Sequence, residues 1–130
     1  MKKKDTKILL VDDEPDILEI VGYNLANEGY QVFTAKNGKI AISEAKKHLP
    51  HLIILDVMMP VMDGYETTKI IRQGNAGINN IRIPIIALTA DAFPETKEKV
   101  VNLGMNDLVS KPFKKQVLNH KIYKMAMKHC

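Results

Sequence analysis

The sequence has no tryptophan and a single cysteine, Cys130, which is its last residue. One cysteine excludes a disulfide framework and offers no cysteine spacing for a metal site. Only 5% of the residues are aromatic, and neither a zinc finger nor helix-turn-helix spacing is present, so we expect no direct nucleic-acid partner. No apolar run approaches the length of a membrane-spanning helix. The basic start of the chain precedes too short an apolar stretch for a signal peptide, and we expect a cytoplasmic protein without membrane insertion.

The length and overall composition are ordinary for a globular protein. The chain has 130 residues, of which 45% are hydrophobic and 26% are charged. We see no linker, internal repeat or low-complexity segment, and therefore expect residues 1–130 to form one domain without a separate output domain.

The net charge of +4 is unevenly distributed. From residue 111 onward the chain has six lysines and no acidic residue, which leaves −2 for the remainder. These lysines are Lys111, Lys114, Lys115, Lys121, Lys124 and Lys128. They either form a docking face for an acidic partner or are the solvated side of a helix.

Short apolar runs alternate with amphipathic segments along the whole chain. The expected strands are residues 7–11, 31–35, 52–55, 84–88 and 107–110. The expected helices are one from Pro15 to the sequence NEGY, residues 40–48, 64–73 and 94–103, and one marked by Val117, Leu118, Ile122 and Met125. Three of the strands are nearly continuous in Ile, Leu and Val, as in parallel strands buried on both faces. The order (βα)₅ predicts a three-layer α/β fold with a parallel five-stranded sheet.

Reactive side chains follow four of the five expected strands. Asp12 and Asp13 follow the first strand and Asp56 follows the third. Thr89 follows the fourth strand and Lys111 follows the fifth. Taken singly, each has a plain explanation: a turn residue, a helix start or a surface lysine. Because the carboxyl ends of parallel strands share one edge of a sheet, we expect the five side chains to converge there.

Such a cluster has a definite chemistry. Two carboxylates about 4 Å apart repel by roughly 4 kcal/mol at an effective dielectric constant of 20, so the acids need a cation. Oxygen ligands without His or Cys favour a hard ion, and Mg²⁺ fits best. A metal, an ammonium group and a hydroxyl can hold a phosphoryl group, and an ionised aspartate can accept one as a nucleophile.

Four segments carry a resemblance to a known family. They are ILLVDDEPDI (8–17), LIILDVMMPVMDGYE (52–66), PIIALTADA (84–92) and GMNDLVSKPF (104–113). In order and spacing they resemble a response-regulator receiver domain of two-component phosphorelay signalling. Their amino-acid sequences are most similar to receivers of hybrid histidine kinases. The resemblance covers essentially the whole chain. It implies a flavodoxin-like fold with strand order 2-1-3-4-5.

The resemblance also implies a phosphoacceptor and a metal site. Asp56 matches the phosphoacceptor, and Asp13 matches the carboxylate that binds Mg²⁺ directly. Asp12 matches the neighbour that helps through water or as a second ligand. The main-chain carbonyl of Met58 matches a further metal contact.

Other positions match the residues around the phosphoryl group. Thr89 matches the switch hydroxyl, and Lys111 matches the lysine that pairs with the phosphoryl group. The resemblance implies a cis bond between Lys111 and Pro112. Asp63 and Gly64 match the turn that shapes the loop after the acceptor.

Two further positions bear on the mechanism. Ala90 is small, as the family prefers, which leaves the phosphorus open to attack. Leu108 departs from the family, which usually has an aromatic residue three positions before the lysine. Rotation of that ring reports phosphorylation to the output face, so an aliphatic repacking would have to replace it here.

The histidines and methionines are expected to have no chemical role. We expect all four histidines to be exposed to solvent. We expect Met58, Met59 and Met62 to pack around the acceptor loop. We expect Phe113 to anchor the last helix to the sheet.

The resemblance implies a switch rather than a conventional enzyme. A histidine kinase or phosphotransfer protein would donate the phosphoryl group. The face of the fourth helix, fifth strand and fifth helix would then change its affinity for an unidentified partner or for a second copy of the chain. The alternative is a docking module that works without phosphate, which Leu108 favours. A magnesium phosphohydrolase is disfavoured, because Met58 stands where such enzymes have a second aspartate and no cap domain is expected.

Overall fold

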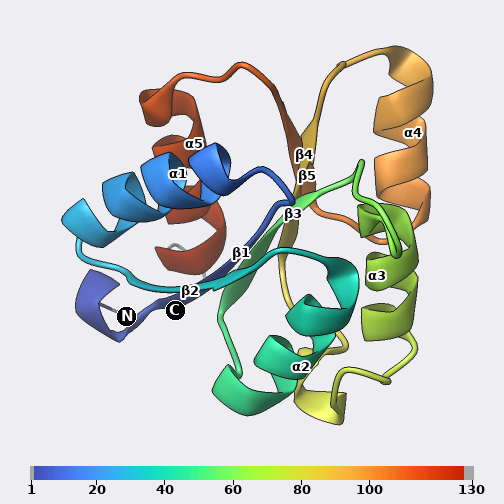
Figure 1. Cartoon of the computed structure of the whole chain (residues 1–130), viewed down its shortest axis with the longest axis horizontal. Helices are drawn as coiled ribbons and strands as arrows, with labels where there is room; N and C mark the ends of the chain where they lie inside the picture. The colour runs from blue at the N-terminus through green and yellow to red at the C-terminus, as the bar shows by residue number, and fades with distance from the viewer. Residues whose placement is uncertain (1, 128–130) are drawn as a thin grey trace.

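The computed structural model describes residues 2–127 and consists of a five-stranded parallel sheet between two layers of helices (Figure 1). The strands are β1 (Lys7–Val11), β2 (Gln31–Ala35), β3 (Leu52–Asp56), β4 (Ile85–Thr89) and β5 (Asp107–Ser110). The main helices are α1 (Pro15–Asn27), α2 (Gly38–His48), α3 (Gly64–Arg72), α4 (Pro94–Asn102) and α5 (Lys115–Ile122). The sheet order is β2-β1-β3-β4-β5, which confirms the expected α/β fold and strand order.

Three short helical segments complete the described chain. They are the 3₁₀ turns η1 (Lys3–Asp5) and η2 (Ile78–Asn80), and the π-helical turn η3 (Tyr123–Met127) that follows α5. Within residues 2–127, no helix is both long enough and apolar enough to span a bilayer. Lys128 of the expected basic tail, His129 and the lone cysteine, Cys130, lie outside the described residues.

Element boundaries differ from the expected ones by one or two residues at several ends. β4 begins at Ile85 because Pro84 has no N–H to donate to a ladder, although the Pro84 carbonyl accepts from Ile53. α2 begins at Gly38, two residues early, because the Asn37 side chain caps it by accepting from the Ile40 N–H at 2.9 Å. Glycine is a weak helix former, so the pattern alone placed this start too late.

The three central strands are buried on both faces, as their composition predicts. Every residue of β3 and β4 is buried, whereas the edge strand β2 buries only Ala35. On one face, alternate strand residues pack against α1 and α5. On the other face they pack against α2, α3 and α4. Phe113 packs against the first of these cores, which supports its expected anchoring role.

The parallel register sets the strand ends level at one edge of the sheet. Val11 of β1 pairs with Leu55 of β3, so the residues that follow both strands leave the sheet side by side. Asp56 pairs with Leu88, and the next residue of β4, Thr89, pairs with Ser110 of β5. The four elements that carry the candidate residues therefore end at the same edge.

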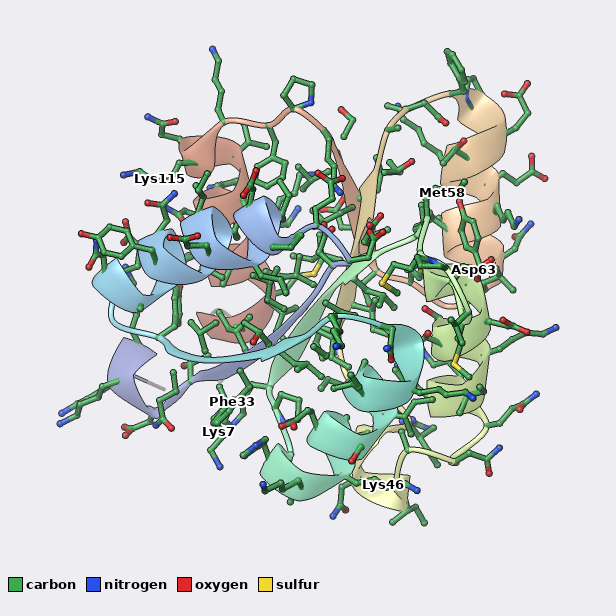
Figure 2. All side chains as sticks on the ribbon, viewed as in Figure 1. Lys7, Phe33, Lys46, Met58, Asp63 and Lys115 are labelled. Atoms are coloured by element: carbon green, nitrogen blue, oxygen red, sulfur yellow. The ribbon has the colours of Figure 1, made fainter. Side chains whose placement is uncertain are left out.

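Two expectations about side chains are wrong. His48 and His51 are half-buried, and the His48 ring stacks on Phe33 with centroids 3.8 Å apart. Met58 is 70% exposed and does not pack, whereas Met59 is 8% exposed. Figure 2 shows Met58 and Asp63 on the loop between β3 and α3, with Lys7 and Phe33 toward the opposite end of the molecule.

Candidate functional site

Three carboxylates meet where β1 and β3 end. One carboxylate oxygen from each of Asp12, Asp13 and Asp56 lies within 4.8 Å of the others. Asp12 and Asp56 are buried and Asp13 is exposed, so the cluster opens to solvent on one side. The expected convergence of these acids is therefore present.

Asp12 is the most deeply enclosed of the three, with no exposed surface. Its Oδ1 accepts a hydrogen bond from the Glu14 N–H at 2.9 Å. Within the described residues, its buried Oδ2 accepts no well-directed hydrogen bond, although Lys111 Nζ lies 2.8 Å away. The Lys111 ammonium offsets part of the cost of burying this oxygen, and a metal cation beside it would offset more.

Asp56, the last residue of β3, is only 3% exposed. The pKa of its carboxyl is raised from 3.8 to about 7, chiefly by burial and also by the charge of Asp12 and a hydrogen bond with Asp13. The Met58 N–H, which donates to Asp56 Oδ1 at 3.1 Å, and the charge of Lys111 lower it. Without a cation, this site therefore holds its central acid in a partly protonated state at neutral pH.

Lys111 brings the positive charge. It follows β5, and its N–H donates to the Thr89 carbonyl at 2.7 Å, which continues the strand ladder. Its Nζ lies 2.8 Å from Asp12, 3.3 Å from Glu14 and 3.5 Å from Asp56. Burial lowers the pKa of Lys111, but the hydrogen bond and charges of these acids outweigh burial and raise it. The Lys111–Pro112 peptide bond is cis, as the resemblance implied.

Thr89 ends β4 and is 3% exposed. Its Oγ1 accepts from the N–H of Asp91 at 3.3 Å. The side chain of Asp91 in turn accepts from the Phe93 N–H at 3.0 Å, immediately before α4. The hydroxyl therefore lies at the expected edge, but its partner is the loop leading to α4 and not the carboxylate cluster.

The loop between β3 and α3 is shaped by two residues that the sequence singled out. Asp63 caps α3, because its Oδ1 accepts from the Glu66 N–H at 2.8 Å. Gly64 lies so close to β3 that a Cβ there would overlap the Asp56 carbonyl oxygen and lie 2.8 Å from Val57 Cα. Val61 has φ of 72°, a left-handed conformation that is strained for a β-branched residue.

The donor set suits a hard divalent cation. All three carboxylates supply oxygen, the group carries more negative charge than Lys111 balances, and one buried oxygen of Asp12 lacks a directed donor. These features fit Mg²⁺, which binds through few carboxylates and keeps some of its waters. The main-chain N–H of Met58 adjoins Asp56, but the ligand role of its carbonyl stays a prediction, and Ala90 is exposed beside the site.

Two residues of this region were not predicted to take part. Glu14 contacts Lys111, and its N–H contacts Asp12. Asp91 links Thr89 to the start of α4. The run of three acids at positions 12–14 was a usable signal for Glu14, whereas nothing in the local sequence distinguishes Asp91 from an ordinary loop acid.

Comparison with known proteins gives a consistent result. The model of the response regulator receiver domain matches residues 8–123. The alkaline phosphatase synthesis transcriptional regulatory protein PhoP of Bacillus subtilis is 40% identical over 116 residues, which cover 89% of this chain and 46% of that protein. This chain thus spans less than half the length of that relative.

Two solved structures show the same fold. Chemotaxis protein CheY4 of Vibrio cholerae superposes with a TM-score of 0.86 at 34% identity, over 92% of this chain and 98% of that one. The receiver domain of sensor histidine kinase PA1611 from Pseudomonas aeruginosa superposes with a TM-score of 0.84 at 36% identity, over 94% and 98%. That second receiver carries a magnesium ion coordinated in its active-site cleft.

Proposed function

Because this chain belongs to the response-regulator receiver family, we propose that it is a phosphoacceptor switch in which Asp56 takes a phosphoryl group from a partner's phosphohistidine. Receiver domains are signalling modules that accept phosphoryl groups from histidine kinases or phosphotransfer proteins. This chain would act in the same way and would not be a conventional enzyme. Residues 1–130 form one receiver domain in this proposal, which acts in the cytoplasm.

In the proposed transfer, an Asp56 carboxylate oxygen attacks the phosphorus of the phosphohistidine. A P–O bond to Asp56 forms as the P–N bond breaks, and the released imidazole takes up a proton. Such a transfer depends mainly on positioning and charge stabilisation. Lys111, 3.5 Å from Asp56, would neutralise negative charge on the phosphoryl oxygens, and exposed Ala90 would leave the line of attack open.

The observation that carries this proposal is the meeting of Asp12, Asp13, Asp56 and Lys111 at one edge. These residues come from three separate strand ends, and a purely structural role would not require their charges to be enclosed together. Asp13 and Asp12, with Asp56 and the Met58 carbonyl, would hold Mg²⁺. When bound, this ion supplies the positive charge that keeps Asp56 ionised and polarises the phosphoryl group.

Phosphorylation would then alter a distant face. The acyl phosphate adds roughly 1.5 to 2 negative charges beside Thr89. In the proposal, the Thr89 hydroxyl turns from Asp91 toward the phosphoryl group, and the face of α4, β5 and α5 changes its affinity for an unidentified partner or a second copy. Such a change requires contacts that differ between the two states.

Phosphorylation by a small donor tests the proposal. Wild type incubated with Mg²⁺ and acetyl phosphate should gain the mass of one phosphoryl group, and chelation of Mg²⁺ should prevent it. Asp56→Asn should gain none, whereas Asp5→Asn, an exposed acid in η1, should react as wild type does. An unmodified wild type, or a phosphorylated Asp56→Asn, would contradict the assignment.

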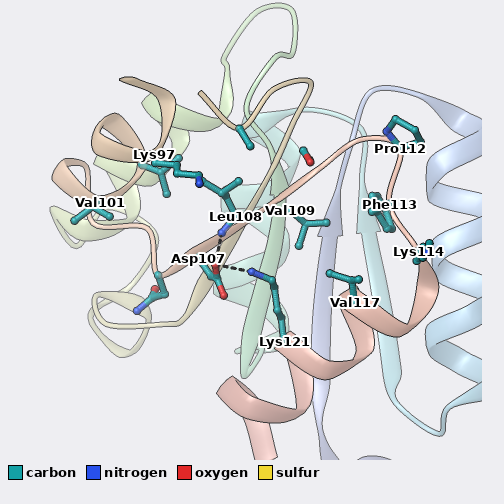
Figure 3. Close-up of a pocket in the computed structure, with 14 residues that line it drawn as sticks. Lys97, Val101, Asp107, Leu108, Val109, Pro112, Phe113, Lys114, Val117 and Lys121 are labelled. Carbon is teal, nitrogen blue, oxygen red and sulfur yellow. Dashed lines mark hydrogen bonds and ion pairs between the residues drawn. The ribbon is translucent and has the colours of Figure 1, made fainter. Parts of the chain in front are cut away.

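A docking module that works without phosphate is the second candidate, and Leu108 is the observation that favours it. An aliphatic side chain at this position faces a groove of about 800 Å³ between α4 and α5 (Figure 3). If partner affinity is the same for wild type, Asp56→Asn and the phosphorylated chain, this second function holds. A difference between these forms supports the switch.

A further inference from the structure

Leu108 is half-buried and aliphatic, so the proposed switch needs another residue to connect the acceptor site to α4. Leu108 lines the groove between α4 and α5 together with Lys97, Val101 and Val117 (Figure 3). It has no ring that could turn between the acceptor site and this groove. The same side chain also packs against the core that contains Val100 of α4. A contact between the acceptor loop and α4 must therefore be sought on another element.

Tyr65 provides such a contact. It follows Gly64, the residue whose backbone lies against Asp56 and Val57, so its position is fixed directly by the acceptor strand. Its half-buried side chain packs against the same core as Leu108. Lys99 Nζ, from α4, lies 4.1 Å from the centroid of the Tyr65 ring, within the range of a cation–π interaction. One side chain thus joins the first turn of α3 to α4.

Asp91 connects the switch hydroxyl to the start of α4, the helix whose Lys99 contacts the Tyr65 ring. Its N–H donates to Thr89 Oγ1, and its side chain bonds to the Phe93 N–H and to Thr96 of α4. Burial and the negative charges of Asp91 and Asp63 raise the pKa of the Tyr65 phenol. Displacement of Thr89 would therefore act on the first turn of α4, and through Lys99 of that helix on the Tyr65 ring.

Helix α4 is attached by contacts near both of its ends but buries little of its own surface. Val100 is its one buried residue. At its C-terminal end, Arg72 of α3 donates to the Gly104 carbonyl from Nε at 2.9 Å and from Nη2 at 2.6 Å. At its N-terminal end, the contacts just described join it to Asp91 and Tyr65. An element with little buried surface is one that small changes in contact can move.

We propose that Tyr65 is the positioning residue that transmits the state of Asp56 to helix α4, in place of an aromatic side chain on β5. When Thr89 turns away from Asp91, the Asp91 N–H loses its acceptor, the Tyr65–Lys99 contact shifts, and α4 pivots about the Arg72–Gly104 attachment. The inference rests on the proposed function, since it assigns the regulation of the same site.

Amide chemical shifts of the full chain test this coupling. The ¹⁵N-labelled protein is titrated with Mg²⁺ and beryllofluoride, a stable phosphoryl mimic, and two sets of amides are followed. The site set is Met58, Thr89 and Ala90, and the α4 set is Lys97, Val101 and Asn102. In wild type both sets should shift.

Three substitutions separate coupling from chemistry. Tyr65→Leu should keep the site shifts but reduce the mean α4 shift at least twofold. Tyr65→Phe keeps the ring face that contacts Lys99 and should restore the wild-type α4 shift. Leu108→Ala should leave the α4 shift within a quarter of the wild-type value. Tyr23→Leu, at an exposed tyrosine of α1, is the matched control and should change neither set.

Each result bears on one proposal. A full α4 shift in Tyr65→Leu, or loss of the α4 shift in Leu108→Ala, overturns the role of Tyr65 and leaves the phosphoacceptor function standing. Loss of the α4 shift in Tyr65→Phe as well as Tyr65→Leu assigns the effect to packing around the hydroxyl and also overturns it. Absence of any site shift in wild type contradicts the proposed function itself, and the coupling falls with it.

Discussion

The polar groups at the two ends of the sheet differ in their surroundings: acids cluster at one end, and hydrogen-bond donors meet acceptors at the other. At the carboxyl ends of the strands, Asp12 and Asp56 are buried together, and the pKa of Asp56 is raised to about 7. At the amino ends, Arg72 donates four hydrogen bonds, three to carbonyl groups and one to Asn106. Buried Asn80 likewise donates to the carbonyls of Ala45 and Ala76.

The difference separates the residues that hold the fold from those that bear the proposed function. The amino-end donors have hydrogen-bond acceptors within the chain, so removal of these donors should only destabilise the fold. Asp56 at the carboxyl ends is buried beside like charges, so its removal should stabilise the fold while it prevents the proposed phosphorylation. Lys111 balances only part of the negative charge at the carboxyl ends, so this site should respond to an added cation and to the further negative charge of a phosphoryl group.

The largest effect is expected where the backbone of the functional edge is most crowded. Gly64→Ala places a Cβ against the Asp56 carbonyl and Val57, backbone atoms that cannot move without shifting β3. We expect it to lower the free energy of unfolding by about 3 kcal/mol, measured by urea denaturation. Gly22→Ala is the control, because nothing lies within 4 Å of a Cβ there, and it should raise stability by up to about 1 kcal/mol. Equal effects at both glycines would refute the role of crowding.

At the opposite end, Arg72→Ala should be nearly as damaging. It would leave the carbonyls of Gly104 and Ile81 without their guanidinium donor, at a cost of about 2.5 kcal/mol in the free energy of unfolding. Arg82→Ala, at an exposed arginine of the neighbouring loop, should change stability by less than about 0.5 kcal/mol. A loss below about 1 kcal/mol for Arg72→Ala would show that solvent replaces these bonds.

Asp56→Asn should have the opposite sign. Because the folded-state pKa is raised from 3.8 to about 7, the folded chain binds a proton more tightly than the unfolded chain between these values, and stability falls as pH rises through them. At about pH 8 without Mg²⁺, the substitution should therefore raise the free energy of unfolding by about 2 kcal/mol.

Thermal denaturation as a function of pH measures this effect. The advantage of Asp56→Asn should shrink as pH falls below 7 and vanish near 3.8. Added Mg²⁺ should stabilise wild type more than the variant. An Asp56→Asn protein less stable than wild type at pH 8 would show that the buried, ionised Asp56 does not destabilise the fold.

The smallest effect concerns His51 at the amino end of the strands. Its Nδ1 accepts from the Lys7 N–H at 2.9 Å, so the ring must be neutral there, and burial together with the charge of Lys7 lowers its pKa below 6.5. A lowered histidine pKa leaves stability intact above 6.5, and stability is lost as pH falls through that value.

Denaturation at about pH 7.5 and about pH 5.5 should show a loss of about 1 kcal/mol attributable to this residue. His51→Gln should flatten the dependence by that amount, whereas His120→Gln, at an exposed position, should not. If the free energy of unfolding depends on pH equally in wild type and His51→Gln, then His51 does not contribute to that dependence.

The sequence predicts the functional edge better than it predicts the opposite one. Continuous runs of Ile, Leu and Val fix the central strands, and parallel pairing then brings Asp12, Asp56 and Lys111 together. The contacts of Arg72 could not be predicted, because they depend on where the carbonyls of Ile81 and Gly104 lie after folding.

Smaller errors have the same cause. Nothing around His48 in the sequence indicates that its ring meets Phe33 from a different element. Exposed Met58 was predicted to pack because methionine is usually apolar filling, whereas the loop turns its side chain outward. Patterns within one segment predict elements, and contacts between segments require the fold.

The register of β1 against β3 also affects how the chain reaches its native state. These two central strands are separated by β2 and α2 in sequence, and their pairing closes a long loop. Long-range pairing of this kind governs the speed of folding. Because the pairing that aligns Val11 with Leu55 also brings Asp12 close to Asp56, we expect like-charge repulsion to oppose that step. We therefore expect protons or divalent ions, which reduce this repulsion, to speed the refolding of the chain.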